Sequence, residues 1–350
     1  MMTSLSEFLA ALGTNPLLAL SMLLVAATIF VNGSTDAANA IAEAVGTRSI
    51  SFRDAILLSV ACNFVGLAGS VAVSTAVADT ISGMVDFGGD DHAALVALSA
   101  AMVAIVVWGV AAWAFGIPTS ESHALIAGLS GAAIAVSGGP SGINFNEWVK
   151  VIYGLLFSTV LGLALGWALT KAIRHIFADT RYSTANRIMS RLQVVGAGFG
   201  ALMHGAQDGQ KFMSTATIAV GLALGTKATA DGGYPLWLML ACAIIMSVGT
   251  AVGGKKIIKT VGTQMVRLEK YQGAAASISE DISLLLATFG GMPVSTTHTK
   301  TAAIMGAGAA KSAKHVDWGI AYDMVLTWVL TFPGCGLIGY VLAWVFLQLF

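Results

Sequence analysis

Apolar residues occur along this chain in long runs separated by short polar connections. Runs of about 20 apolar residues are typical of helices that cross a lipid bilayer. Such runs lie near 17–42, 55–78, 93–116, 122–137, 148–172, 193–222, 235–253, 275–290, 298–310 and 318–349. Two of them, 122–137 and 298–310, are short enough for half-spans or re-entrant hairpins, and the last is long enough for two helices with a break near Pro333 and Gly334. The pattern predicts an all-α membrane protein, a polytopic helical bundle of about 10–12 spans that include broken or re-entrant helices.

The composition agrees with this pattern and excludes several classes of protein. Only 10% of the residues are charged and 56% are hydrophobic, whereas soluble domains carry about 25% charged residues. The formal net charge is zero, so we expect no nucleic-acid partner. Cys62, Cys242 and Cys335 lie far apart in apolar segments, which is not the spacing of a metal site. We therefore expect no cofactor and no metal beyond a coupling Na⁺.

Basic residues indicate the orientation, because short cytoplasmic loops are enriched in Lys and Arg. Placing the basic connections inside puts both termini outside, with five crossings before and five after the 171–191 connection. Since five is odd, the second half must run opposite to the first. We expect inverted-topology repeats at 1–175 and 193–350, joined by a cytoplasmic connector at 176–192, in a plasma (inner) membrane. The basic residues concerned are Arg48 and Arg53; Lys171, Arg174, Arg181, Arg187 and Arg191; Lys255, Lys256, Lys259, Arg267 and Lys270; and Lys311 and Lys314.

One polar segment occurs in both halves as Gly-small-polar-Asp, at 33–36 and at 205–208. A carboxylate inside a span costs several kcal/mol unless it is paired or hydrated, so Asp36 and Asp208 are candidate functional residues. Asp36 and Asn39 are three residues apart and share a helical face. With carbonyls freed by local unwinding at the Gly-rich stretch, they could bind a small cation. The alternative is that each carboxylate merely hydrogen-bonds a neighbouring helix.

A second polar segment also occurs in both halves, at 116–123 and 291–298. Each copy places a Gly-x-Pro break before a short polar, hydroxyl-bearing start of a helix. Free N–H groups and the helix dipole attract an anion at such a start, although Ser and Thr there can also act as helix caps. The hydroxyl groups that could bind an anion belong to Ser120, Ser122, Ser295, Thr296 and Thr297.

These segments resemble the inorganic phosphate transporter (PiT) family, with its signature Gly-Ala-Asn-Asp-Val-Ala-Asn-Ala in each half. The signature is similar to 33–40 and, more loosely, to 205–212, and the family's Pro-Val-Ser-Thr-Thr-His element matches 293–298 in full and 118–123 in part. The resemblance covers essentially the whole chain. It implies symport of phosphate with Na⁺ or H⁺ through a helical fold with an inverted repeat, often as a homodimer in the lipid bilayer.

The resemblance also implies roles for individual residues. Asp36, Asn39 and Asp208 would coordinate the coupling cation. The hydroxyl groups named above, together with Gln207, would bind phosphate.

Four positions depart from the family pattern. Thr35 replaces the first signature Asn, and Gln207 takes the equivalent place in the second copy. Lys211 stands where the second copy should have its second Asn, and Glu121 stands where the family has Thr. A fixed ammonium at Lys211 could replace one bound Na⁺, leaving fewer Na⁺ sites or favouring proton coupling. Alternatively, Lys211 and Glu121 neutralise each other inside the protein.

Three histidines lie beside these segments. His123 and His298 end the hydroxyl-rich elements, and His204 precedes the second Asp segment. No zinc-binding pattern surrounds them. We expect each to make a hydrogen bond or to carry a proton.

The sequence thus favours cation-coupled phosphate symport by alternating access. A sulfate or other oxyanion permease of the same fold is the nearest alternative, and a channel is a further one. An intramembrane hydrolase using Asp, Ser and His is disfavoured, because the chain has no Gly-x-Ser-x-Gly elbow and because a duplicated, inverted arrangement suits alternating access.

Overall fold

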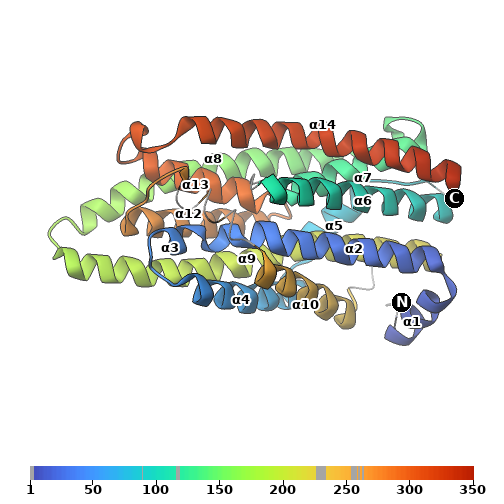
Figure 1. Cartoon of the computed structure of the whole chain (residues 1–350), viewed down its shortest axis with the longest axis horizontal. Coiled ribbons are helices and arrows are strands. Elements are labelled where there is room, and N and C mark those ends of the chain that lie inside the picture. The colour runs from blue at the N-terminus through green and yellow to red at the C-terminus, as the bar shows by residue number, and fades with distance from the viewer. Residues whose placement is uncertain are drawn as a thin grey trace.

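The computed structural model describes residues 4–88, 90–115, 119–225, 234–253, 258, 261 and 264–350. Gly116, Ile117 and Pro118 of the second polar segment, and the basic residues Lys255, Lys256 and Lys259, lie outside the described residues. Helices make up the fold (Figure 1), which confirms the predicted all-α bundle. They are α1 (Leu5–Thr14), α2 (Pro16–Thr35), η1 (Asp36–Ile41), α3 (Ala42–Gly46), α4 (Phe52–Val73), α5 (Ala76–Gly83), α6 (Asp91–Phe115), α7 (Glu121–Ser137), η2 (Pro140–Gly142), α8 (Phe145–Ile176), α9 (Tyr182–Leu224), α10 (Leu236–Val252), α12 (Lys270–Phe289), α13 (Thr296–Ala309), η4 (Ala313–His315) and α14 (Trp318–Leu349).

Five helical segments within the described residues are long and apolar enough to cross a membrane. Apolar side chains on the outer faces of α8 and α14, such as Leu156, Val160, Val329 and Leu337, are exposed. Large exposed apolar surface of this kind fits a lipid environment rather than water. The five segments are Pro16–Gly46, Phe52–Ser70, Asp91–Phe115, Phe145–Ile176 and Trp318–Leu349.

Three predicted boundaries differ from the structure. The expected break near Pro333 and Gly334 is wrong, because α14 continues through Pro333 as one helix; such prolines are tolerated where neighbouring helices satisfy the freed backbone groups. The run at 55–78 instead divides into α4 and α5. The first run leaves α-helical geometry at Asp36, where α2 gives way to the 3₁₀ helix η1.

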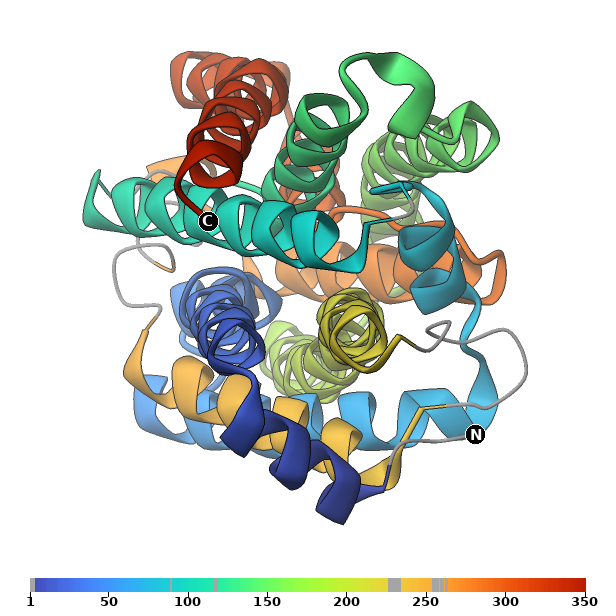
Figure 2. The same ribbon diagram turned by 90° about the vertical axis from the view of Figure 1, so that its right-hand side faces the viewer.

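The two helices that carry the Asp segments lie in the middle of the molecule. Figure 2 shows α2 and α9 side by side, with α6 and α12 on one side of them and α4 and α10 on the other. Beyond α6 and α12 lie α7, α8, α13 and α14. The Asp segments are therefore shielded on both sides by helices.

Each major helix contact of one half has a counterpart in the other. α2 packs against α10 as α9 packs against α4, and α7 packs against α14 as α13 packs against α8. Isolated β-bridges join Val85 to Ile143 and Val266 to Val316. The helices of one half thus pair with those of the other in matching combinations.

The glycines of the two Asp segments allow close helix contacts. A Cβ atom on Gly33 would collide with the carbonyl oxygen of Met246 in α10, and one on Gly205 would collide with the carbonyl oxygen of Asn63 in α4. Small residues are used in this way where membrane helices approach closely. The Gly of each Asp segment therefore has a packing role.

The two ends of the molecule along its long axis differ in the chain segments that they contain. Figure 1 shows both termini at one end and the connection between α8 and α9 at the other. α2 and α9 run in opposite directions, and α7 and α13 extend from the middle towards opposite ends. The first turns of α7 and α13 meet near the centre, where the rings of His123 and His298 are 4.2 Å apart.

Candidate functional site

The first Asp segment forms half of a buried polar site. In η1, residues three apart lie on the same side of the 3₁₀ helix, so Asp36 and Asn39 both face α13. Thr297 receives a hydrogen bond from the Asn39 side-chain amide at 2.9 Å and donates one to Asp36 Oδ1 at 3.1 Å. The predicted shared face of Asp36 and Asn39 is thus present, and Thr297 joins them.

The second Asp segment forms the other half, but within an unbroken helix. α9 continues from Tyr182 to Leu224 through Asp208 and Lys211. The ammonium of Lys211 lies 2.6 Å from Asp208 Oδ1, 2.7 Å from Ser122 Oγ and 2.5 Å from the carbonyl oxygen of Val294. Lys211 therefore contacts the hydroxyl group of Ser122 much as Asn39 contacts that of Thr297.

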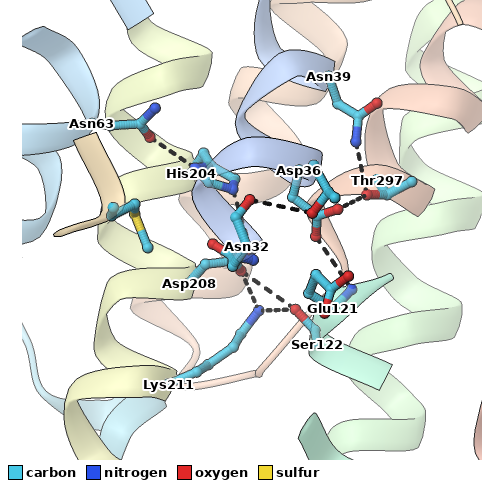
Figure 3. A network of polar contacts seen from close by, with 12 residues as sticks. Asn32, Asp36, Asn39, Asn63, Glu121, Ser122, His204, Asp208, Lys211 and Thr297 are labelled. Atoms are coloured by element: carbon cyan, nitrogen blue, oxygen red, sulfur yellow. Dashed lines mark hydrogen bonds and ion pairs between the residues drawn. The ribbon is translucent and has the colours of Figure 1, made fainter. Parts of the chain in front are cut away.

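The two halves meet in one cluster (Figure 3). Asn32 donates to Asp208 Oδ2 at 3.0 Å, and the backbone N–H of Glu121 donates to Asp36 Oδ2 at 3.4 Å. The side chains of Asp36, Glu121, Asp208 and Lys211 are at most 2% exposed. These four side chains are therefore buried away from solvent in this conformation.

Glu121 has an unusual position in this cluster. It is fully buried, and within the described residues neither of its carboxylate oxygens has a hydrogen-bond partner. Gly109 of α6 makes room for it, since a Cβ atom there would lie 2.5 Å from Glu121 Oε1. The alternative pairing of Lys211 with Glu121 is not what the structure shows: the Lys211 ammonium pairs with Asp208.

The hydroxyl-bearing residues divide into three groups. Ser120 and Ser295 cap α7 and α13, each accepting the backbone N–H three residues later at 3.2 Å. Ser122 and Thr297 contact the carboxylates of the cluster. Thr296 is buried, and its hydroxyl group has no hydrogen-bond partner in the described part of the chain. Capping thus explains two of the five predicted residues.

Gln207 lies apart from the hydroxyl cluster. Its amide nitrogen donates to Thr288 Oγ1 at 3.0 Å and to the carbonyl oxygen of Met292 at 3.3 Å. These partners lie at the end of α12 and just after it. In this conformation the structure does not bring Gln207 against the other predicted phosphate ligands.

The three histidines have different surroundings. His204 belongs to the site, with Nδ1 2.7 Å from Asn63 Oδ1 and Nε2 3.3 Å from Asp208 Oδ2. His298 stacks on Trp328 at 3.7 Å between ring centroids, and His123 packs against Phe332 at 4.4 Å. His123 and His298 therefore contact each other and α14.

Sequence reasoning missed Asn32 and a second group of buried charged residues. Asn32 precedes the predicted segment by one position and carries no charge that would single it out. Most of the second group was detectable, because ionisable residues inside predicted spans are functional candidates by default, and all its members but Glu43 lie inside the runs at 275–290 and 298–310. Its members are Glu43, Glu280, Asp281 and Lys300.

The central cluster combines features for cations and for an anion. Asp36, Glu121 and Asp208 contribute three buried carboxylates, of which that of Asp208 pairs with the Lys211 ammonium. Hydroxyl groups and the N-terminal turns of α7 and α13 adjoin them, a setting that suits an oxyanion. No group of His, Cys, Asp and Glu within the described residues has the arrangement of a metal-ion site.

The known proteins that this chain resembles are phosphate transporters. A family model for the phosphate transporter family matches residues 32–189 and 178–339. A probable low-affinity inorganic phosphate transporter of Bacillus subtilis (strain 168) is 38% identical over 321 residues, which cover 91% of this chain and 94% of that protein. One from Mycobacterium leprae (strain TN) is 34% identical over 323 residues, which cover 90% of this chain and 75% of that protein.

A solved structure, titled the sodium-dependent phosphate transporter, has a similar fold. It superposes with a TM-score of 0.83 and covers 95% of this chain and 99% of its own. At 22% sequence identity, this likeness bears on the fold alone.

Proposed function

Because the chain belongs to the phosphate transporter family and is a transporter rather than an enzyme, we propose that it moves inorganic phosphate across the plasma membrane in symport with a cation. The observation that supports this most is the central cluster of three buried carboxylates and one ammonium beside the hydroxyl groups of two helix starts. Transport would proceed by alternating access, with the cluster exposed first to one side and then to the other.

The charge of the cluster supports cation coupling. With Asp36, Glu121 and Asp208 ionised and Lys211 protonated, two negative charges have no counter-charge. Each buried unpaired charge costs several kcal/mol, and adding a phosphate anion would raise that cost. Na⁺ or H⁺ binding at the carboxylates removes it, so phosphate and cation would bind together.

Phosphate would bind between the first turns of α7 and α13. Ser122 and Thr297 already contact the carboxylate side of the cluster, and Thr296 offers a buried hydroxyl group. Neutral donors and free backbone N–H groups hold an oxyanion without a fixed counter-charge. Such a site can release phosphate once the cation leaves. Ser120, Ser295 and Gln207 are further proposed ligands, and Gln207 would have to turn away from Thr288.

The cluster has two corresponding positions for a cation, one beside Asp208 and one beside Asp36, and the Lys211 ammonium would permanently occupy the one beside Asp208. This ammonium contacts Asp208 and Ser122, while Asp36, Asn39 and Thr297 surround the other position with oxygen and amide groups. A coupling Na⁺ or H⁺ would then bind at Asp36, with Asn39 as a further Na⁺ ligand. Of the histidines, His204 is the best placed to exchange a proton with the cluster.

The two-repeat organisation is also a proposal. Repeats at 1–175 and 193–350, inverted relative to each other and joined by a connector at 176–192, would explain why helix contacts recur in matching pairs and why α2 and α9 run in opposite directions. The termini would lie outside, because the basic connector lies at the opposite end of the molecule. The exposed faces of α8 and α14 would contact lipid, and a homodimer stays a prediction.

Phosphate uptake into proteoliposomes tests the function. We expect an imposed Na⁺ or H⁺ gradient to drive saturable accumulation, and Asp36→Asn to lose about 100-fold of this uptake. Arsenate should compete with phosphate more strongly than sulfate does. Stronger competition by sulfate would favour the oxyanion permease, and flux that neither saturates nor accumulates substrate would favour a channel.

A further inference from the structure

A second buried charge cluster lies between α3, α12 and α13. Glu43 and Lys300 are fully buried, Glu280 is 1% exposed and Asp281 is 9% exposed. The Lys300 ammonium lies 2.7 Å from Glu43 Oε1 and also forms an ion pair with Glu280. Ser277 donates a hydrogen bond to Glu43. Nothing in the proposed transport site uses these four charged residues.

The second cluster is one helical turn away from the central site. Glu43 follows Asn39 by four residues, and Lys300 follows Thr297 by three. The contact between Glu43 and Lys300 therefore lies about one turn along from the contact between Asn39 and Thr297. Lys300 also approaches the carbonyl oxygen of Ala40 at 3.4 Å. The two sites share the interface of α13 with the η1–α3 segment.

α9 connects the two sites along one face. A Cβ atom on Gly200 would lie 3.0 Å from Glu280 Oε2 and 3.2 Å from Asp281 Oδ1. His204, four residues later, contacts Asp208 of the central site, and residues four apart are neighbours on a helix. Gly200, His204 and Asp208 therefore lead from the second cluster to the central one.

The same face leads in the other direction to a cavity. Gln193 accepts a hydrogen bond from Thr47 and donates one to the carbonyl oxygen of Lys270, both at 2.6 Å. Thr47, Met189 and Lys270 line a cavity of about 320 Å³ near the connection between α8 and α9. The second cluster thus lies between the central site and a cavity at the connector end.

The second cluster has more acid than base. Three carboxyl groups share one ammonium, which contacts Glu43 and Glu280 and leaves Asp281 without a direct contact. Among the described residues, Asp281 Oδ1 and Glu43 Oε2 have no hydrogen-bond partner. A buried carboxylate without a partner is costly, and protonation removes the charge. The Lys300 ammonium among the carboxyl groups repels a metal cation such as Na⁺. A proton, in contrast, binds directly to one carboxyl oxygen.

The other half of the chain lacks these charged residues at the corresponding sequence positions. At the same distance from Asp208 as Glu43 from Asp36, the chain has Thr215. At the same distances from the Pro of the first segment as Glu280 and Lys300 from that of the second, it has Ile105 and Leu125. The charged residues thus occur on the connector side of the central site and not at the corresponding positions on the other side.

We propose that Glu43, Glu280, Asp281 and Lys300 form a second proton-binding site on the connector side, with Asp281 as the carboxyl group that holds the proton. The groups that act on Asp281 are Glu280 of its own helix, Glu43 of α3 and Lys300 of α13, with His204 of α9 near Glu280. The direction of release rests on the proposed function. When the connector side opens, water enters and lowers the cost of ionisation, so Asp281 gives its proton to water in the cavity. When that side closes, the carboxyl group takes up a proton again from the central site, by way of His204 between Asp208 and Glu280.

Infrared spectroscopy of the full chain in lipid tests the site without requiring transport. Only a protonated carboxyl group gives the C=O stretch of a carboxylic acid. We expect Asp281→Asn to remove such a band from the wild-type spectrum near neutral pH. Asp179→Asn, the same change at an exposed acid in the connection between α8 and α9, is the matched control and should remove none. If Asp281→Asn does not fold, Asp281→Glu should keep the band at a shifted frequency.

Transport in proteoliposomes provides the second readout. One coupled proton contributes about tenfold accumulation per unit of pH gradient. For each unit of pH gradient, Asp281→Asn should therefore accumulate about tenfold less phosphate than the wild type while keeping phosphate–phosphate exchange, and Asp179→Asn should lose neither. An unchanged infrared band in Asp281→Asn, or loss of the wild-type band on adding Na⁺, would overturn the proposal. Absence of phosphate exchange in the wild type would instead contradict the proposed function and leave the infrared result to decide the site.

Discussion

The segments around Asp36 and Asp208 share a sequence pattern but fold differently. At Asp36 the α-helix gives way to the 3₁₀ helix η1, and the carboxylate accepts hydrogen bonds from Thr297 and from the backbone of Glu121. At Asp208 the helix α9 is unbroken, and an ammonium from its own next turn holds the carboxylate.

The difference between them lies mainly in Lys211. An Asp three residues before a Lys stabilises a continuous helix, and the buried pair satisfies both charges. Asn39, in the corresponding place after Asp36, brings no charge. The carboxylate of Asp208 is thus compensated by the protein itself, whereas that of Asp36 has no such partner and is the one that the proposed function assigns to the coupling cation.

The largest contrast is expected between Asp36→Asn and Asp208→Asn. Asp36→Asn removes an uncompensated carboxylate, so the protein should keep its thermal stability and lose cation-driven uptake by about 100-fold, the scale of losing charged contacts. Asp208→Asn strands the Lys211 ammonium, which should destabilise the protein by about 3–5 kcal/mol. Thermal unfolding and uptake should be measured for both variants. Equal destabilisation by the two changes would contradict the difference in compensation.

Glu121→Gln should have a smaller effect. The change keeps the shape of a side chain that fits against Gly109 and removes a carboxyl group that has no hydrogen-bond partner among the described residues. We expect thermal stability to stay the same or rise, and uptake to depend less steeply on pH or Na⁺, with a loss of about tenfold. Glu147→Gln, at a partly exposed acid paired with Lys150, is the control. A Glu121→Gln protein with wild-type cation dependence would remove Glu121 from the coupling mechanism.

The smallest contrast is expected between Thr297→Ala and Ser122→Ala. Thr297 bridges Asp36 and Asn39, whereas Ser122 is one of three Lys211 contacts. A neutral hydrogen bond contributes about 1 kcal/mol. Thr297→Ala should therefore weaken the apparent cation affinity about fivefold, and Ser122→Ala should weaken it less. Initial uptake rates over a cation titration give both values, and the reverse order would argue that the Asp208 side is the one open to the cation.

Much of this arrangement was predictable from local sequence. Apolar runs predicted the helices, and the three-residue spacing of Asp36 and Asn39 predicted their common face. Helix capping by Ser or Thr was predicted as an alternative to anion binding, and in the structure Ser120 and Ser295 are the caps. These features depend on residues a few positions apart.

The rest depended on packing between distant segments. Sequence spacing alone could not show that Asn39 contacts Thr297, or that Lys211 pairs with Asp208 and not with Glu121. These contacts depend on how α7 and α13 are placed relative to α2 and α9. The contact of Gln207 with Thr288 has the same origin. The continuity of α14 through Pro333 likewise depends on neighbouring helices.

The most direct test of the account is the number of coupling cations carried per phosphate by the wild type and by Lys211→Asn. Lys211→Met, which removes the ammonium without offering a ligand, is the control. Radiolabelled phosphate accumulation at a series of imposed cation gradients measures this number in proteoliposomes. The account predicts that Lys211→Asn carries one more cation per phosphate than the wild type and that Lys211→Met does not. An unchanged number in Lys211→Asn would contradict the claim that the Lys211 ammonium stands in the place of a coupling cation.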